Sequence, residues 1–408
     1  MPALPSKTIL TSAILILLST LYQFIISPIL FDVLGYRRSL TTLDNYGVSC
    51  EKLDIPELEA CEDAWFHEPT GYLYLACSDL ESRFQWLPAG NRYNTSGRGL
   101  RDRMAVLDTW GTGSLESRFQ WMKPEGFTGN QGDGTFNLHG FDVRVDPETD
   151  ALHFIIINHR PPFDPVTGEA LDPEKIGANS TIEHFESKVG SSSLKHVKTY
   201  SDETIKTPNR VAWVSEHAFA FTNDHSDKVG YRRELDPFLG GGSIGLCNAA
   251  TSSCKIAYST FLRGPNGLKL GPDGLLYVPI TFTPEIQVFS VADTTLELVT
   301  KIKTPYPLDN MSVDKNGDII VAGIPQTYKW LANLDDRSID VPSAVLRVKK
   351  RQDKDGNGKE GEDYEVEIMI EDDGTIMAGG TIAVHDVEKK KVYVAGITEP
   401  HVLVCSLP

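Results

Sequence analysis

Two short motifs contain residue types that could carry out chemistry. GGSIG at 241–245 matches the G-x-S-x-G pattern, in which a turn between a strand and a helix presents a serine nucleophile. An Asp-Pro step precedes it and a polar loop bounded by cysteines follows it, so we do not expect such a turn around Ser243. DKDGNG at 353–358 begins like an EF-hand calcium loop, but position twelve is Tyr364 rather than glutamate and no helices flank it. We interpret this segment as an acidic hairpin turn.

The cysteines and sequons indicate the compartment. Two sequons begin at Asn94 and Asn179, and the number of cysteines is even. Together with the apolar N-terminal segment described next, they predict an oxidising, lumenal or extracellular environment. Two cysteine pairs are close in sequence: Cys61 and Cys77 flank a predicted hairpin, and Cys247 and Cys254 close a short loop. The six residues are Cys50, Cys61, Cys77, Cys247, Cys254 and Cys405.

An uncharged segment runs from Thr8 to Phe31, with Lys7 before it and Asp32 after it. At 1.5 Å per residue this helix would cross a bilayer core of ~30 Å. No small-x-small cleavage site follows, which favours an uncleaved signal anchor over a cleaved signal peptide. We therefore expect a membrane anchor over residues 1–35 and a folded domain over 36–408.

The overall composition narrows the partners. The chain has 408 residues, of which 40% are hydrophobic and 23% are charged, as in an ordinary globular protein. Its net charge of −17 argues against nucleic acid, whose phosphates require a basic face. An acidic surface is compatible with cation binding and with small neutral substrates.

Six short turns, each leading into an alternating apolar run, predict the fold. Their Pro, Asn, Asp and Gly residues are typical of β-hairpins, because Gly and Asn tolerate positive φ. Six hairpins with almost no helical periodicity between them predict an all-β, six-bladed β-propeller after the N-terminal hydrophobic helix; a β-sandwich is the alternative. The six turns lie at 67–71, 146–150, 215–217, 271–274, 314–317 and 387–389.

A second repeat is the heptapeptide LESRFQW, which occurs at both 80–86 and 115–121. We interpret it as coincidence or local duplication rather than a functional pair.

A set of fragments, in order and spacing, resembles the serum paraoxonase/arylesterase family over roughly Cys50 to Cys405. The resemblance implies a six-bladed propeller that hydrolyses lactones and aryl esters, and in some members organophosphate triesters, with calcium at its centre. The fragments are FNLHGF (136–141), IINHR (156–160), TPNRVAWV (207–214), FTNDH (221–225), GPNGLKLGPDG (264–274) and LDNMSVD (308–314).

The resemblance also implies a calcium ligand set, in which Glu62 stands in the family's acidic step. Calcium takes six to eight oxygen ligands, and this set offers two carboxylates and three neutral amides. Two carboxylates balance the charge of a calcium ion without exceeding it, so the ion remains an effective Lewis acid. Asn310 also begins a sequon, but burial as a ligand would forbid glycosylation there, and we prefer the ligand role. The implied ligands are Glu62, Asn209, Asn266, Asp309 and Asn310.

His139 and His159 match the family's histidine dyad. Histidine can act as a base near neutral pH, because its unperturbed pKa is ~6.5. The resemblance implies that His139 deprotonates water and that His159 supports it. Asp309 is the alternative base or nucleophile.

One departure from the family pattern concerns its second, structural calcium. That ion is expected to bind the Asp63 carboxylate, the Phe141 carbonyl and a further carboxylate, for which this chain has Arg210. We predict that Arg210 replaces the ion and pairs with Asp63. The family's ring-closing disulfide maps to Cys50 and Cys405.

The sequence leaves the exact activity open. A calcium-dependent arylesterase or lactonase is the preferred prediction, with calcium as cofactor and a small ester or lactone as substrate. A non-catalytic propeller that binds a ligand or partner is the alternative from another class. A gluconolactonase-like or strictosidine-synthase-like propeller with other chemistry is a further alternative. We expect the enzyme domain to be lumenal or extracellular, held by the membrane helix or secreted.

Overall fold

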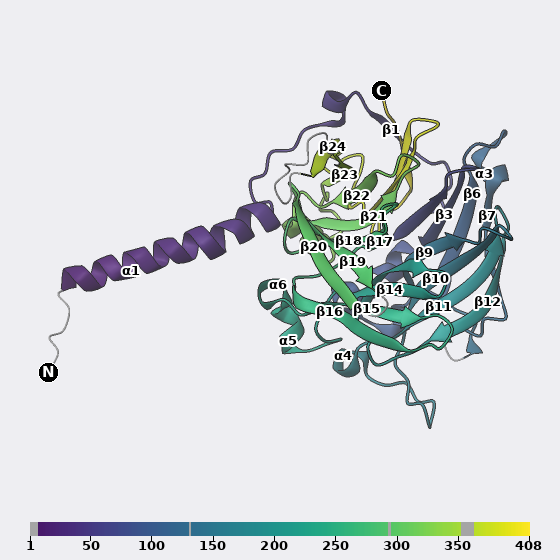
Figure 1. The fold of residues 1–408 in the computed structure, drawn as a ribbon, viewed down its shortest axis with the longest axis horizontal. Helices are drawn as coiled ribbons and strands as arrows, with labels where there is room; N and C mark the ends of the chain where they lie inside the picture. The colour runs from purple at the N-terminus through teal and green to yellow at the C-terminus, as the bar shows by residue number, and fades with distance from the viewer. Residues whose placement is uncertain (1–6, 130–131, 293–294, 352–362) are drawn as a thin grey trace.

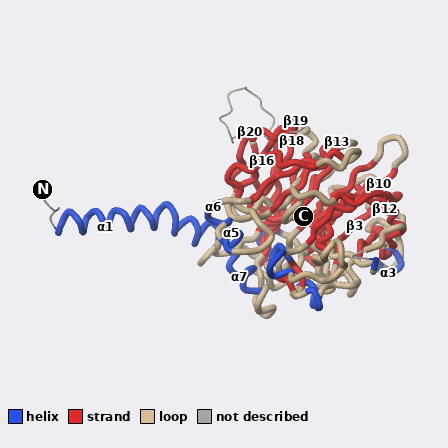
Figure 2. Tube along the Cα trace, turned by 90° about the horizontal axis from the view of Figure 1, so that it is seen from below, coloured by secondary structure: helices blue, strands red, loops and turns tan. Residues whose placement is uncertain are grey.

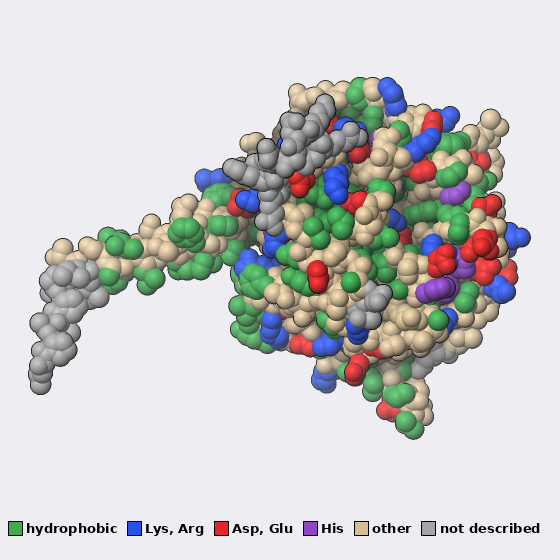
Figure 3. Space-filling view, viewed as in Figure 1, with side chains coloured by type: hydrophobic (Ala, Val, Ile, Leu, Met, Phe, Trp, Pro, Cys, Tyr) green, Lys and Arg blue, Asp and Glu red, His purple; other side chains and the backbone are tan. Residues whose placement is uncertain are grey.

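A computed structural model describes residues 7–129, 132–292, 295–351 and 363–408; the segment 353–358 lies outside them. Helix α1 (Lys7–Leu21) projects from the body of the molecule (Figure 1) and continues through wider π-helical turns at Tyr22–Ile26 and Pro28–Val33. The second of these turns begins at Pro28, which has no N–H to donate. The stretch Thr11–Val33 has a mean hydropathy of 2.1, and its apolar side chains are exposed along the rod (Figure 3). An apolar helix of this kind fits a secreted or membrane-anchored protein.

Six sheets of mainly antiparallel strands, the blades, form most of the remaining described chain, and the prediction of a six-bladed propeller is confirmed. Blade 1 consists of β2 (Asp63–His67), β3 (Tyr72–Cys77), β6 (Arg103–Asp108) and β7 (Phe119–Trp121). Blade 2 consists of β9 (Leu138–Val145), β10 (Ala151–Arg160), β11 (Asn179–Lys188), β12 (Ser193–Tyr200) and an added β8 (Lys123–Glu125).

Blade 3 consists of β13 (Pro208–Ser215), β14 (Ala218–Asn223), β15 (Gly242–Asn248) and β16 (Cys254–Leu262). Blade 4 consists of β17 (Lys269–Leu270), β18 (Leu275–Ile280), β19 (Glu285–Ala292) and β20 (Thr295–Lys303).

The last two blades complete the ring. Blade 5 has β21 (Leu308–Val313), β22 (Ile319–Gly323), β23 (Ser343–Lys350) and β24 (Tyr364–Asp372), and blade 6 has β25 (Ile382–Asp386), β26 (Lys391–Ala395), β27 (Leu403–Ser406) and β1 (Ser49–Lys52). Blade 6 therefore combines strands from both ends of the domain. Cys50 pairs with Cys405 in the β1–β27 register, and the expected disulfide joins them.

All six predicted turns join the two innermost strands of a blade. The apolar side chains of these runs are buried because the strands of a blade pack against the neighbouring blades on both faces. Between blades 4 and 5, for example, Val288 of β19 belongs to the same buried cluster as Val321 and Leu346. Each such side chain contributes about 1.5–3 kcal/mol when fully buried.

Insertions cover one end of the propeller. In each blade the second strand ends on the side of the propeller where the innermost strand begins. The loops that join the second and third strands therefore cover the beginnings of the innermost strands. Blade 1 inserts α2 (Leu80–Arg83) and the hairpin β4 (Trp86–Leu87)–β5 (Arg92–Tyr93); blade 3 inserts α5 (Tyr231–Glu234) and α6 (Asp236–Leu239); and blade 5 inserts α7 (Thr327–Asn333). Helices α5, α6 and α7 lie near the propeller end of α1 (Figure 2). The other short helices are α3 (Leu115–Arg118), α4 (Pro173–Ile176) and 3-10 turns at Leu43–Tyr46, Pro88–Gly90 and Thr95–Gly97.

The chain leaving the apolar helix is bound to the start of α7. Thr327 Oγ1 donates to the Val33 carbonyl at 2.9 Å, and Gln326 Nε2 donates to the Arg38 carbonyl at 3.1 Å. Gly35 adopts φ +68°, and a Cβ there would lie 2.0 Å from the Pro325 carbonyl oxygen, so only glycine fits. The segment that follows the apolar helix is thus fixed to the α7 insertion of blade 5.

Candidate active site

The five implied calcium ligands come from the starts of innermost strands. Glu62 directly precedes β2, Asn209 is in β13, Asn266 precedes β17, and Asp309 and Asn310 are in β21. All except Asn310 line one pocket on the axis, and Asn310 Nδ2 donates to Glu62 Oε1 at 2.9 Å. The structure brings the set together from four blades.

The donor chemistry of this cluster fits calcium. The Oδ1 atoms of Asn209, Asn266 and Asn310 are buried and have no hydrogen-bond donor. A buried acceptor without a partner costs about 1–3 kcal/mol. Three such acceptors beside two carboxylates are the oxygen ligand types that calcium takes. Among the described residues, no group of three or more His, Cys, Asp or Glu side chains could hold a metal.

The two carboxylates oppose each other's ionisation. Burial raises the pKa of Glu62 to about 7, with the Asp63 charge adding to this and Arg83 opposing it. Burial and the charge of Glu62 raise the pKa of Asp309 well above its usual value, although a hydrogen bond from Asn266 lowers it. A bound divalent cation would remove this penalty, since it favours both ionised forms.

His139 lies beside this centre in β9. Its Nε2 is 3.7 Å from Glu62 Oε1, and neither ring nitrogen has a hydrogen-bond partner. Burial, followed by the nearby His159 and Arg83, lowers the pKa of His139 well below the ordinary value. The ring is therefore neutral at physiological pH and can accept a proton.

His159 stands behind His139, with ring centroids 5.0 Å apart. Its Nδ1 is 2.8 Å from Ser180 Oγ, and Trp86 Nε1 donates to its carbonyl at 2.8 Å. Burial lowers its pKa to about 3, so it too is neutral. The contacts orient His159 toward its partner without charging it.

Arg210 occupies the place expected of the structural calcium. Its guanidinium is 1% exposed and forms an ion pair with Asp63, as predicted. Phe141 contributes its N–H, which donates to Asp63 Oδ2 at 2.7 Å, rather than the expected carbonyl. The other Asp63 oxygen accepts the Ala64 N–H at 2.7 Å. With both oxygens satisfied and Arg210 adjacent, these residues do not fit a second calcium.

The insertions form an apolar wall above the polar floor. The pocket contains about 660 Å³ of empty space, part of it open to solvent. The carboxylates and amides of the cluster lie at the strand starts, whereas the apolar groups lie in the covering loops, so the site can hold an apolar acyl or aryl group. The apolar lining consists of Leu87, Ala89, Phe282, Ile324, Trp330, Leu331 and Ile397.

Sequence reasoning missed three residues at the site. Thr381 donates to Glu62 Oε2 at 2.9 Å and precedes the sixth innermost strand. Asp224 lines the pocket and lies 3.5 Å from the Asn209 amide nitrogen. Arg83 is 3% exposed and donates to the Leu138 carbonyl at 2.8 Å. The position of Thr381 in the repeat was an available signal, whereas Arg83 gave none.

The other sequence candidates lie apart from this centre. Ser243 belongs to strand β15 and accepts a hydrogen bond from Asn223, so it is not on a nucleophile turn. Asn94 and Asn179 are exposed, while Asn310 is completely buried and closed to glycosylation.

Comparison with known proteins finds sequence matches over much of the chain. The arylesterase family model matches residues 173–407. Rat serum paraoxonase/arylesterase 1 is 26% identical over 252 residues, 61% of this chain and 63% of that protein. Bovine serum paraoxonase/arylesterase 2 is 24% identical over 276 residues, 67% of this chain and 69% of that protein. A gluconolactonase of Xanthomonas campestris, 16% identical, covers 90% of this chain and 94% of its own at a TM-score of 0.48.

The match with the rat protein spans less than two thirds of that protein's length. The family model, in contrast, covers more than half of this chain, from α4 to the ring-closing strand β27. That segment supplies four of the five clustered side chains, all except Glu62. The chain belongs to the arylesterase family.

Proposed function

We propose that this protein is a calcium-dependent hydrolase of carboxylic esters and lactones, with organophosphate triesters as further substrates. The observation that carries the proposal is the cluster of three unpartnered amide oxygens and two carboxylates beside the neutral His139. Family membership supports an ester-cleaving reaction. A binding module would have no need of an unpartnered base at this position.

Glu62, Asn209, Asn266, Asp309 and Asn310 would hold the calcium. When bound, the ion would polarise the carbonyl or phosphoryl oxygen of the substrate. The apolar wall holds the acyl or aryl group and excludes water from it. His139 accepts a proton as water attacks the carbonyl carbon, and returns it to the leaving oxygen as the ester C–O bond breaks. His159, which Ser180 orients, lies beside the His139 ring and would position it for this proton transfer.

The first test uses purified protein and three substrates: phenyl acetate, a γ-lactone and paraoxon. We expect hydrolysis of all three in calcium, loss of activity in EGTA and recovery when calcium is restored. Calcium binding measured without substrate separates the metal site from the reaction. Calcium binding without hydrolysis of any ester or lactone would favour a non-catalytic propeller, and full activity in EGTA would rule out the metal site.

Calcium affinity should depend on pH. The raised pKa values of Glu62 and Asp309 mean that the metal-free site holds protons near neutral pH. Calcium must displace them, so affinity falls as pH drops through about 7, by up to about tenfold per pH unit for each displaced proton. Calorimetry at pH 6, 7 and 8, in buffers of different ionisation enthalpy, measures both affinity and proton release. An equal affinity at all three pH values would contradict this account.

We also propose that the apolar helix anchors the enzyme in a membrane and that the propeller lies on the lumenal or extracellular side. Three disulfides and the exposed Asn94 and Asn179 support this side, because disulfides and N-glycans form in the secretory pathway. Glycosidase treatment and protease protection of microsomes would measure glycosylation and orientation.

A further inference from the structure

Glu62 is held by three blades at once. Asn310 of blade 5 donates to its Oε1, and Thr381, at the start of blade 6, donates to its Oε2, both at 2.9 Å. Its own backbone N–H donates to the Ala76 carbonyl at 3.0 Å, which extends the β2–β3 ladder of blade 1 by one bond. The side chain is thus held by the neighbouring blades and the main chain by its own hairpin.

The end of the β2–β3 ladder is the weak point of this arrangement. Glu62 is 2% exposed and directly precedes β2. Strand ends are where a ladder opens most easily. If the ladder opened there, the Glu62 carboxylate would leave the axis, so its position depends on how its main chain is held.

The chain enters Glu62 through a strained residue. Ala60 has φ +47° and is completely buried, and its N–H donates to the Glu399 carbonyl at 2.8 Å. A left-handed conformation costs a residue with a Cβ about 1–2 kcal/mol. Such strain persists only where the surrounding structure fixes it, and it is concentrated at functional sites.

The residue between Ala60 and Glu62 forms a disulfide. Cys61 is bonded to Cys77, the last residue of β3, and each is 1% exposed. Cys77 directly follows Ala76, the acceptor of the Glu62 N–H. The covalent link therefore closes the β2–β3 ladder at the point where it would open to release Glu62.

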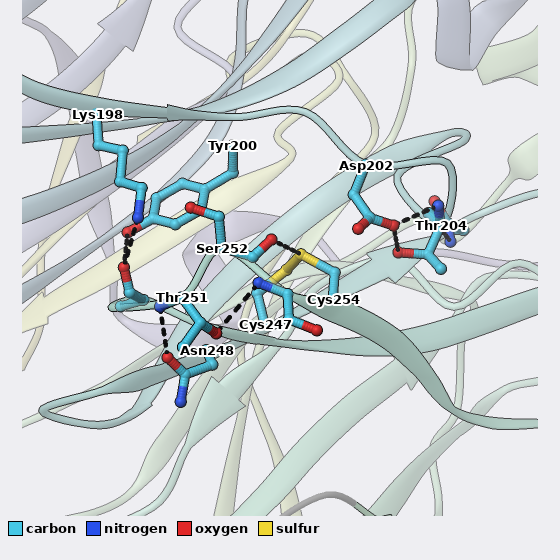
Figure 4. Close-up of a disulfide and its surroundings, with 12 residues drawn as sticks. Lys198, Tyr200, Asp202, Thr204, Cys247, Asn248, Thr251, Ser252 and Cys254 are labelled. Atoms are coloured by element: carbon cyan, nitrogen blue, oxygen red, sulfur yellow. Dashed lines mark hydrogen bonds between the residues drawn. A yellow bond between two sulfur atoms is a disulfide. The ribbon is translucent and has the colours of Figure 1, made fainter.

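The chain contains a matched disulfide away from the site. Cys247 and Cys254 are paired across β15 and β16 in the outer part of blade 3 (Figure 4). Tyr200 lies beside this bond, and its hydroxyl donates to the Ala249 carbonyl at 3.0 Å. None of these residues lines the pocket. This bond also closes a hairpin, but it positions no ligand.

We propose that the Cys61–Cys77 disulfide, with the left-handed Ala60, is a positioning device that holds Glu62 in the calcium site before the ion binds. This inference rests on the proposed calcium site. It makes the bond a determinant of metal affinity, beyond any contribution to stability. Changes to groups that orient metal ligands typically reduce affinity by 10–100-fold, and an effect of about that size is expected here.

The test compares Cys61→Ser/Cys77→Ser with Cys247→Ser/Cys254→Ser in the full-length protein in detergent. Thermal unfolding gives stability, and calorimetric titration with calcium, well below both unfolding temperatures, gives affinity. Both variants should lose stability, because each loses one loop constraint. Only the first should bind calcium about 10–100-fold more weakly. If the first serine pair does not fold, Cys61→Ala/Cys77→Val, which fills the same space with apolar groups, takes its place.

Two results would overturn the positioning role while leaving the calcium site intact: unchanged affinity in the Cys61/Cys77 variant, or equal weakening in both variants. The second would mean that affinity simply follows stability. If the unaltered protein binds no calcium, the proposed metal site fails and the positioning role fails with it.

Discussion

Replacing His139 by glutamine should lower kcat for phenyl acetate by about 10²–10⁴-fold, the usual contribution of general acid–base catalysis. Glutamine retains hydrogen-bonding capacity but cannot accept the proton from water. His139 is not among the five oxygen ligands, so calcium affinity should be unchanged. Initial rates and calorimetric titration of the same preparation would measure both quantities.

His159→Gln should give a smaller loss of kcat, because His159 acts through His139. His217→Gln is the control, since this histidine is exposed in the β13–β14 turn. Its rate should equal that of the unaltered enzyme. A full rate in His139→Gln would reject the dyad and make Asp309 the preferred base.

Removing either member of the Arg210–Asp63 pair should reduce the free energy of unfolding by about 3–5 kcal/mol, because each change leaves a buried charge without its partner. Asp63→Ala leaves the guanidinium at 1% exposure. Arg210→Met leaves a carboxyl whose pKa burial has already raised to about 6, despite the opposing charge of Arg210. Urea unfolding in excess calcium would measure both losses.

The double variant Asp63→Leu/Arg210→Met should be more stable than either single variant, because apolar groups often replace a buried ion pair at little cost. Metal analysis should find one tightly bound calcium per chain. Two calcium ions, or losses below about 1 kcal/mol in both single variants, would mean that Arg210 does not substitute for an ion, since surface pairs contribute only that much.

The blades were predictable because their signal is local. At 271–274 and 314–317, for example, turn residues and the apolar alternation beside them specify a hairpin without distant partners. The ligand set followed from family resemblance. Thr381 could have been added by noting that every other innermost strand begins with a site residue.

The duplicated heptapeptide shows why other features were not predictable. Both copies begin with a helical turn, Leu80–Arg83 and Leu115–Arg118, but they then diverge. In the first copy Trp86 is buried and bonded to His159, whereas Trp121 in the second lies partly buried under Arg103. Identical local sequence gives different conformations because contacts distant in sequence decide which side chains are buried. The burial of Arg83 depends on such contacts.

The closure of the ring also has a consequence for the order of events during synthesis. Strand β1 is translated early, but its partner β27 lies about 355 residues later. At 5–20 residues per second, that interval is roughly 20–70 s. Throughout it, β1 has an unpaired edge, and Cys50 lacks its native partner and can pair with other cysteines. The first strand of the propeller is thus among the last to be paired, and oxidation after translation fixes it in place.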